Sequence, residues 1–256
     1  MRLTVVGCSG SFPGPDSPAS CYLVQAPYDG RTYSLVLDLG NGALGALQRH
    51  IELRNVDTVA LSHLHVDHCI DLTSFYVMRC FFPDGPLPRL PVVGPPGTAE
   101  RIARAYGRLD TTDLDKIFDF ADWQVDRSAA YGPFRVSVAR VAHPVETYAV
   151  RVEHDGRSLV YSADTGPSEA LVGLARGADL LLCEASLLES AQGPADLHLT
   201  GRQAAEHGAR AGVRRLMLTH IPPWHDKQQV LSEAMAARPA LDGPIELALP
   251  GAAYDV

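Results

Sequence analysis

The chain has 256 residues, 46% of them hydrophobic, which suffices for a large core, and we expect residues 1–256 to form one domain. Its formal charge of −8 argues against a broad nucleic-acid surface, because such a surface needs clustered Lys and Arg. Five widely spaced cysteines without a CxxC pair, and no signal-peptide or transmembrane run, argue against a secreted disulfide scaffold and a membrane partner and favour the cytoplasm.

The first 106 residues predict a strand-rich sheet with helices between the strands. Apolar runs between turn signals indicate strands at residues 3–6, 21–24, 33–37, 59–61 and 90–93, and helices at residues 43–50, 71–80 and 98–106. A loop rich in Gly, Pro and Ser follows the first strand at residues 7–18. This loop is either a plain strand connection or an anion-facing loop in which Ser9 is the candidate substrate contact.

The remaining residues also predict strands with helices between them. The pattern indicates strands at residues 117–120, 134–141, 148–153, 158–161, 179–183, 216–219 and 245–249, and helices at residues 167–177, 200–211 and 227–237. Each half combines hairpins with a strand that ends on a histidine. The sequence therefore predicts an α/β (α+β) fold in which two sheets pack face to face with helices outside.

A cluster of metal-capable side chains follows the predicted strand at residues 59–61. It reads His63-Leu64-His65-Val66-Asp67-His68. In an extended chain His63 and His65 project the same way, so that one metal ion can take both imidazoles. Asp67 and His68 come after the chain turns and point to a neighbouring spot, which indicates two adjacent metals. The alternative is a polar loop that is merely rich in histidine.

Other predicted strands also end on metal-capable residues, namely His143, Asp164 and His220. With the cluster they supply five imidazoles and two carboxylates, enough for two metals that share a ligand. This donor set suits zinc, and manganese and iron also fit it. Asp38 ends another strand and is either a turn residue or a carboxylate that supports the ligands from behind.

The six-residue cluster resembles the HxHxDH signature of the metallo-β-lactamase superfamily. The resemblance implies a four-layer αββα sandwich with a dinuclear site at one edge. It places His63, His65 and His143 on the first metal, and Asp67, His68 and His220 on the second. Asp164 would then bridge both ions.

Two later segments resemble the ribonuclease Z-like branch of that superfamily. They are Glu184-Ala185-Ser186 and Asp196-Leu197-His198-Leu199-Thr200. The resemblance implies that His198 lies over the substrate phosphate and that Glu184 orients it by a hydrogen bond. The alternative for His198 is a surface position beside a helix.

Four further segments, residues 7–11, 14–20, 44–50 and 220–224, are similar to an actinobacterial group that includes atypical cyclic-nucleotide phosphodiesterases. The implied activity is hydrolysis of 3′,5′-cyclic AMP and related nucleotides. Metal binding lowers the pKa of a bound water to roughly 7, so a hydroxide that bridges the two ions is the implied nucleophile. Asp67 would steer it, and His198 would stabilise the phosphoryl oxygen or protonate the leaving 3′-oxygen. Trp224 either stacks on the base of the substrate or is a partly buried residue that only lines the site.

The main alternative is ribonuclease Z activity on transfer RNA. Resemblance implies a long tRNA-binding arm between the motifs of His143 and Asp164, but only twenty residues separate them here. The sequence therefore favours a small phosphodiester over tRNA. A thiolester or β-lactam hydrolase and a metal-binding scaffold without activity remain further alternatives, and the family implies a homodimer. We expect His50, His154, His207 and His225 to be surface residues.

Overall fold

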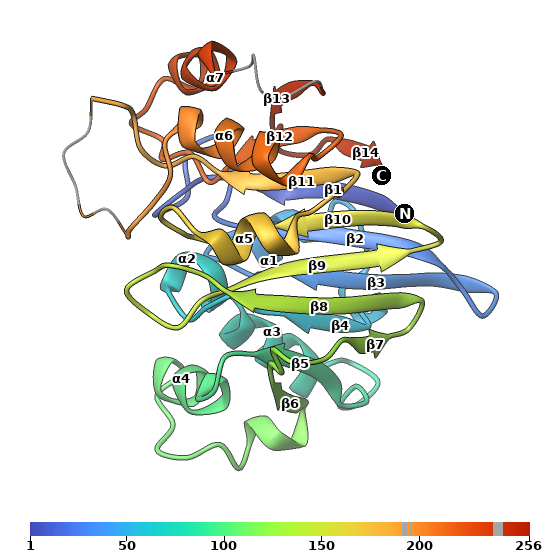
Figure 1. The fold of residues 1–256 in the computed structure, drawn as a ribbon. Coiled ribbons are helices and arrows are strands. Elements are labelled where there is room, and N and C mark those ends of the chain that lie inside the picture. The colour runs from blue at the N-terminus through green and yellow to red at the C-terminus, as the bar shows by residue number, and fades with distance from the viewer. Residues whose placement is uncertain (191–193, 195, 238–242) are drawn as a thin grey trace.

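The computed structural model describes residues 1–190, 194, 196–237 and 243–256. Two seven-stranded sheets pack face to face, and helices cover the outer face of each, so the molecule has the four layers expected from the sequence (Figure 1). The two termini lie side by side because the first and last strands pair with each other. None of the helices in the described ranges is both long enough and apolar enough to span a membrane.

The first sheet has the strand order β14-β1-β2-β3-β4-β5-β6 and is parallel from β3 to β6. Its strands are β1 (Arg2–Gly7), β2 (Cys21–Tyr28), β3 (Arg31–Leu37), β4 (Thr58–Ala60), β5 (Leu90–Gly94), β6 (Phe118–Asp122) and β14 (Ala253–Asp255). The helical segments that accompany it are α1 (Ala43–Leu47), η1 (Leu53–Asn55), α2 (Val66–Cys69), α3 (Leu72–Cys80), α4 (Thr98–Ala105) and η2 (Leu114–Lys116).

The second sheet has the order β13-β12-β11-β10-β9-β8-β7 and is parallel from β10 to β13. Its strands are β7 (Ala129–Tyr131), β8 (Phe134–Arg140), β9 (Tyr148–His154), β10 (Arg157–Tyr161), β11 (Leu180–Glu184), β12 (Leu216–Thr219) and β13 (Ile245–Leu247). Three helices cover its outer face, namely α5 (Glu169–Leu174), α6 (Gly201–Ala211) and α7 (Lys227–Ala236).

Three apolar layers hold the sandwich together. The middle layer lies between the sheets and takes alternate residues of facing strands, such as Val24 on β2 and Val150 on β9. The outer layers pack the first sheet against α1, α3 and α4, and the second sheet against α5, α6 and α7. Central strands such as β11 are buried on both faces, which is why β11 reads as a continuous apolar run.

Most predicted elements are confirmed to within a few residues. The predicted helices at residues 43–50 and 167–177 are too long, because α1 ends at Leu47 and α5 begins only after the Ser168 side chain caps it. The strands β7 and β14 were not expected. Each is three residues long, too short for a clear apolar pattern: β7 forms a hairpin with the next strand, β8, and β14 pairs with β1 at the other end of the chain.

The strands that precede the metal-capable residues have their carboxyl ends at one edge of the sandwich. β3 and β4 run parallel and so end together, as do β10, β11 and β12 in the other sheet. β8 shares their direction because it is antiparallel to β9, which is antiparallel to β10. Loops at this edge carry the metal-capable residues, as expected for a sheet whose ligands lie beyond its carboxyl ends.

Leu182 tests the packing between the sheets, because its side chain is fully buried in the middle layer. We expect Leu182→Ala to lower the free energy of unfolding by about 2–5 kcal/mol through lost burial and a residual cavity. Leu109→Ala is the control, since Leu109 is fully exposed and its loss costs less than about 0.5 kcal/mol. Urea titrations compare the two, and equal stabilities would contradict the assigned core.

Candidate metal centre

The histidine cluster begins in an extended segment after β4 and ends in α2. His65 has φ −67° and ψ 153° and forms the N-terminal boundary of α2, so Asp67 and His68 lie in the first helical turn. The predicted turn is therefore a short helix. Gly40 makes room for it, because an added Cβ at Gly40 would lie 2.0 Å from the Asp67 carbonyl oxygen. The helix places Asp67 and His68 in a second group of ligand-type atoms beside the first.

The first group of ligand-type atoms comes from His63, His65, His143 and Asp164, and these atoms all lie within 4.8 Å of one another. His65 Nδ1 is 3.1 Å from His63 Nε2 and 3.3 Å from His143 Nε2. Asp164 Oδ2 is 3.6 Å from His63 Nε2. The structure thus brings together the three histidines that the sequence assigns to one metal.

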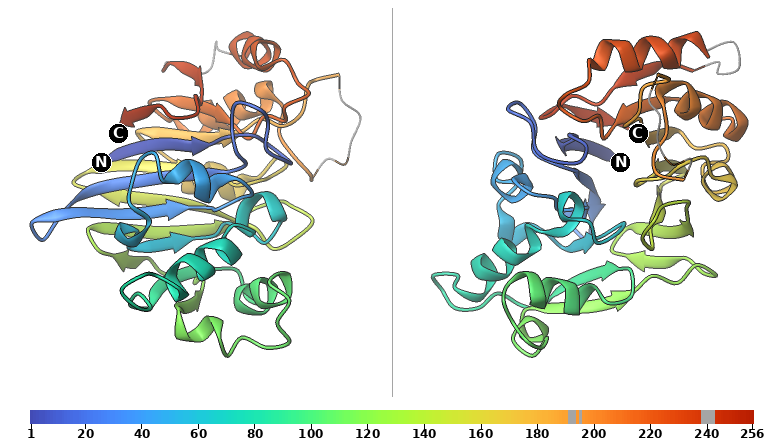
Figure 2. Two further views of the ribbon diagram at one scale, coloured as in Figure 1. Left: turned by 180° about the vertical axis from the view of Figure 1, so that it is seen from behind. Right: turned by 90° about the vertical axis from the view of Figure 1, so that its left-hand side faces the viewer.

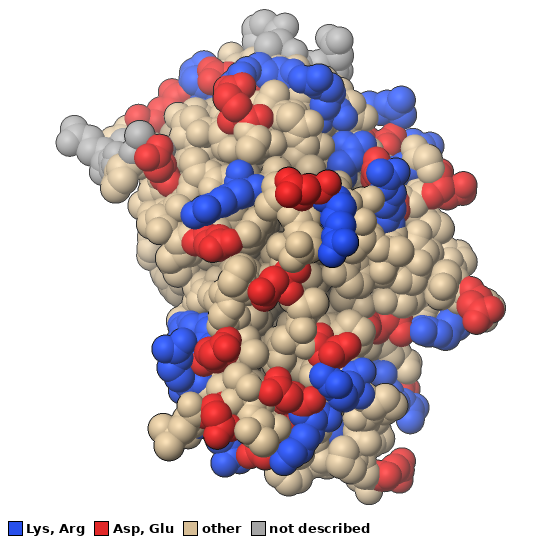
Figure 3. Space-filling model, turned by 60° about the horizontal axis from the view of Figure 1, so that its bottom comes forward, with Lys and Arg blue, Asp and Glu red and all other residues tan. Residues whose placement is uncertain are grey.

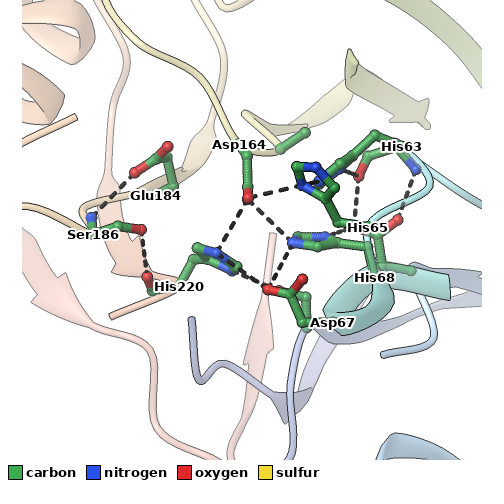
Figure 4. Close-up of polar contacts among 12 residues, drawn as sticks. His63, His65, Asp67, His68, Asp164, Glu184, Ser186 and His220 are labelled. Atoms are coloured by element: carbon green, nitrogen blue, oxygen red, sulfur yellow. Dashed lines mark hydrogen bonds and ion pairs between the residues drawn. The ribbon is translucent and has the colours of Figure 1, made fainter. Parts of the chain in front are cut away.

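The second group joins Asp67, His68 and His220 to the same aspartate (Figure 4). Asp164 Oδ1 is 3.2 Å from His68 Nε2, and Asp164 Oδ2 is 3.3 Å from His220 Nε2. Asp67 Oδ2 lies 3.5 Å from His68 Nε2 and 3.7 Å from His220 Nε2. Asp164 therefore lies between the two groups, in the place that a bridging ligand would take.

The chemistry of this donor set fits metal ions. His68 Nε2, Asp164 Oδ1 and His220 Nε2 are buried and have no hydrogen-bond partner among the described residues. Buried polar atoms are nearly always paired, so three orphans that converge on one point indicate a missing partner. Imidazole nitrogens and carboxylate oxygens are the ligands that metal cations such as zinc take in proteins, and these residues would supply them.

In three of the candidate ligand histidines, the ring nitrogen that faces away from the site is held by another group. His68 Nδ1 bonds Asp38, His220 Nδ1 bonds Ser20 Oγ at 2.9 Å, and His143 Nδ1 bonds the Leu197 carbonyl oxygen at 2.9 Å. Such contacts fix the ring orientation and leave the other nitrogen free for a metal, as is usual for metal-binding histidines.

Asp38 is buried completely and accepts four hydrogen bonds. The Ser62 backbone N–H and hydroxyl each donate at 2.7 Å, His68 Nδ1 donates at 2.7 Å, and the Tyr161 hydroxyl donates at 2.9 Å. These groups come from both sheets and from α2. The role behind the ligands that the sequence offered for Asp38 therefore matches its contacts.

Burial and neighbouring charges set the protonation of the ligands. Burial lowers the pKa of His63, His65 and His143, so these imidazoles are neutral at pH 7 and keep a lone pair for a metal. Burial raises the pKa of Asp67, but the neighbouring imidazoles of His68 and His220 more than offset this and lower it to about 2. Neutral imidazoles and ionised carboxylates are the forms that bind metals.

His198 and Glu184 form a third feature beside the clusters. His198 Nδ1 is 2.8 Å from Glu184 Oε1, and Glu184 also accepts the backbone N–H groups of Thr165, Ser186 and Leu199. Burial lowers the pKa of His198, but the Glu184 carboxylate more than offsets this and raises it to about 9. The imidazole is therefore protonated at neutral pH, and the predicted hydrogen bond is present.

Neither of the two candidate substrate contacts belongs to a ligand group. Trp224 is 63% exposed. Ser9 is buried, and its hydroxyl donates to the Ser17 carbonyl oxygen at 3.2 Å, so the side chain serves the loop's own hydrogen bonding here. The roles of Trp224 and Ser9 in substrate binding stay predictions.

The expectation of a surface position for His207 is wrong. His207 is buried on the inner face of α6, where its Nε2 accepts the Ser168 backbone N–H at 3.0 Å. Sequence reasoning also missed Ser20, Ser62 and Tyr161, which hold the ligands or Asp38 in place. Ser62 immediately precedes the histidine cluster and was the easiest to find. Ser20 and Tyr161 gave no local signal.

Three comparisons place the chain among known proteins. The domain described as "Beta-lactamase superfamily domain" matches residues 34–221. An uncharacterized protein of Mycobacterium leprae is 46% identical over all of this chain and 89% of its own length, and a ribonuclease Z of Mycobacterium avium is 33% identical over 96% of this chain and 95% of its own. The crystal structure of the metallo-β-lactamase fold protein YhfI from Bacillus subtilis covers 99% of this chain and 98% of its own, with a TM-score of 0.86 and 26% identity.

Asp164 tests whether one carboxylate serves both clusters. We expect Asp164→Ala to lower the bound metal at both sites, because the substitution removes an oxygen from each group. Metal content per chain, measured by mass spectrometry after dialysis, checks this. Asp126→Ala is the control, because Asp126 is exposed and belongs to none of the ligand groups. Unchanged metal content in Asp164→Ala would contradict the bridging position.

Glu184 tests the protonation of His198. The folded-state pKa of about 9 lies above the ordinary value of about 6.5, so the ion pair stabilises the fold fully below pH ~6.5 and loses its contribution as the pH rises through about 9. We expect Glu184→Gln to lower the His198 pKa, since burial then acts without the compensating carboxylate. An imidazole NMR titration of the metal-free protein measures both values, and an unchanged pKa would refute the pairing.

Proposed function

Because the chain belongs to the metallo-β-lactamase superfamily and is a metal-dependent hydrolase, we propose that it is a phosphodiesterase of 3′,5′-cyclic nucleotides such as cyclic AMP. The product would be the nucleoside monophosphate. The observation that carries the proposal is the position of His198, a protonated imidazole beside two ligand groups that share Asp164. A phosphodiester needs this combination, because negative charge builds on its oxygens and on the leaving oxygen during cleavage.

The metal content that we propose is two divalent ions, zinc first, with manganese or iron also suited to the donors. His63, His65 and His143 would hold one, Asp67, His68 and His220 the other, and Asp164 both. When bound, the ions supply Lewis-acid activation of water and neutralise phosphoryl oxygens.

His198 is the proposed proton donor. Its ring centroid lies 5.5 Å from that of His143 and 5.8 Å from that of His220, so it stands over both ligand groups. Glu184 holds the Nδ1 proton, which leaves the Nε2 proton for the leaving 3′-oxygen or a phosphoryl oxygen. Asp67 is ionised at neutral pH and is placed to orient the attacking water.

Transfer-RNA processing is the alternative, and the relatives named ribonuclease Z favour it. Two observations weigh against it. β9 and β10 take up most of the residues between His143 and Asp164, where the resemblance implies a protruding arm. On the face drawn in Figure 3, Lys and Arg alternate with Asp and Glu, and neither sign covers a broad area of the described surface. A small phosphodiester as partner is therefore preferred, and homodimer formation and a cytoplasmic location stay predictions.

His198→Ala tests the proposed acid. We expect the variant to keep its metal and to lose phosphodiester cleavage by about 10²–10⁴-fold, the usual size of a general-acid contribution. His154→Ala is the matched control, because His154 lies at the far end of β9 and bonds only the Pro133 carbonyl oxygen among described residues. Wild-type turnover in His198→Ala, with metal bound, would refute the role.

A substrate panel tests the proposed function itself. The purified protein, loaded with zinc or manganese, is given 3′,5′-cyclic nucleotides, linear dinucleotides and a precursor tRNA. We expect the cyclic nucleotides to give the highest kcat/KM. Preferred cleavage of precursor tRNA would establish the alternative, and two bound metals without turnover of any phosphodiester would overturn the proposal.

A further inference from the structure

We infer that Phe12 and Trp224 form an aromatic wall at the rim of the metal centre that binds the nucleobase of the substrate. The inference rests on the proposed function and adds the means of base recognition. Phe12 lies in the loop after β1, and Trp224 lies in the segment after β12, so the wall is built from opposite ends of the chain and from both sheets. Figure 2 shows these two parts of the chain in blue and in orange to red. The sequence pattern singled out Trp224 alone.

The aromatic pair is exposed without serving the core. The ring centroids are 5.0 Å apart with an interplanar angle of 37°. Trp224 is 63% exposed and Phe12 is 40% exposed, and neither belongs to any of the three apolar layers. Single exposed apolar side chains are ordinary on a protein surface, but two large aromatics held together in water form a surface suited to a flat apolar partner.

Backbone contacts tie the wall to a metal ligand. Gly10 donates its N–H to the Ile221 carbonyl oxygen at 3.2 Å, directly after the ligand His220. A Cβ added at Gly10 would lie 2.3 Å from the His220 carbonyl oxygen, so the loop packs against that residue as closely as a glycine allows. Phe12 is two residues further along this loop, and Trp224 is four residues after His220. The wall therefore keeps a fixed position relative to the metal centre.

The chemistry of the ligand follows from the two rings. Bases stack on aromatic side chains through their π faces, and this contact tolerates any base. Two tilted rings offer more area to a purine than to a pyrimidine. The Trp224 indole N–H is already directed to His225 Nε2 at 3.2 Å, so stacking on the exposed ring surface is the contact left for the base. The wall thus favours purine cyclic nucleotides through stacking rather than through hydrogen bonds.

Steady-state kinetics test the wall with a substrate that has a base and one that lacks it. We expect Phe12→Ala and Trp224→Ala each to raise KM for cyclic AMP about fivefold or more, with kcat little changed, because the rings bind the base and do not touch the reacting bond. KM for a base-free ribose 3′,5′-cyclic phosphate should stay constant. Phe81→Ala is the matched control, since Phe81 is 72% exposed but lies at the end of α3.

A second readout separates the wall from the activity. Trp224 is exposed and Trp123 is buried, so quenching of tryptophan fluorescence by adenosine monophosphate reports on Trp224. We expect saturable quenching that weakens in Phe12→Ala and disappears in Trp224→Phe. If the protein turns over no cyclic nucleotide but this quenching occurs, the proposed function fails and the wall stands.

Three results would overturn the wall. One is turnover of cyclic AMP with unchanged KM in both alanine variants. Another is that the wild-type protein shows neither fluorescence quenching by adenosine monophosphate nor turnover of cyclic nucleotides, which would overturn both proposals. The third is a change of sedimentation coefficient in the variants without a change in KM, which would assign the two rings to contact with a second copy of the chain.

Discussion

The buried carboxylate of Asp38 is the constraint on which the site depends. Asp38 directly follows β3, and its backbone has a φ of 57°, which residues other than glycine rarely adopt. Four hydrogen-bond donors surround its carboxylate. Those donors come from Ser62 after β4, from His68 in α2 and from Tyr161 at the end of β10. A fully hydrogen-bonded buried carboxylate is rigid, because any displacement leaves a charge unpaired. Asp38 therefore fixes both the spacing of the two sheets at this edge and the direction of His68.

The two ligand groups depend on how the two sheets are placed at this edge. His63 and His65 follow one sheet, Asp164 and His220 follow the other, and only the packing of the two sheets brings them together. Such a set of facing nitrogens and oxygens is costly without a cation, because buried polar atoms lose water and gain no partner. His220, like Asp38, has a positive φ, of 54°. Backbone strain of this kind persists where the surrounding structure over-determines it and is common at functional sites.

The sequence was informative where the signal is local. The spacing within residues 63–68 and the apolar strands before His143, Asp164 and His220 predicted that these residues gather at one site, since strand ends in a sandwich share an edge; their division into two groups came from the family resemblance. It was silent where the cause is long-range. The contact of Tyr161 with Asp38 depends on how the sheets pack, and His207 read as a surface residue because only the packing of α6 against the Ser168 turn buries it. The partner of β14, β1, likewise lies at the other end of the chain.

The central claim is that one carboxylate, Asp164, serves two metal ions at the edge where the two sheets meet. Diffraction from a zinc-soaked crystal, with anomalous data collected at the zinc absorption edge, tests it most directly. The account predicts two anomalous peaks about 3.5–4 Å apart, one on each side of the Asp164 carboxylate, as in other two-metal hydrolytic sites. A single peak, or peaks away from the histidines of either group, would contradict it.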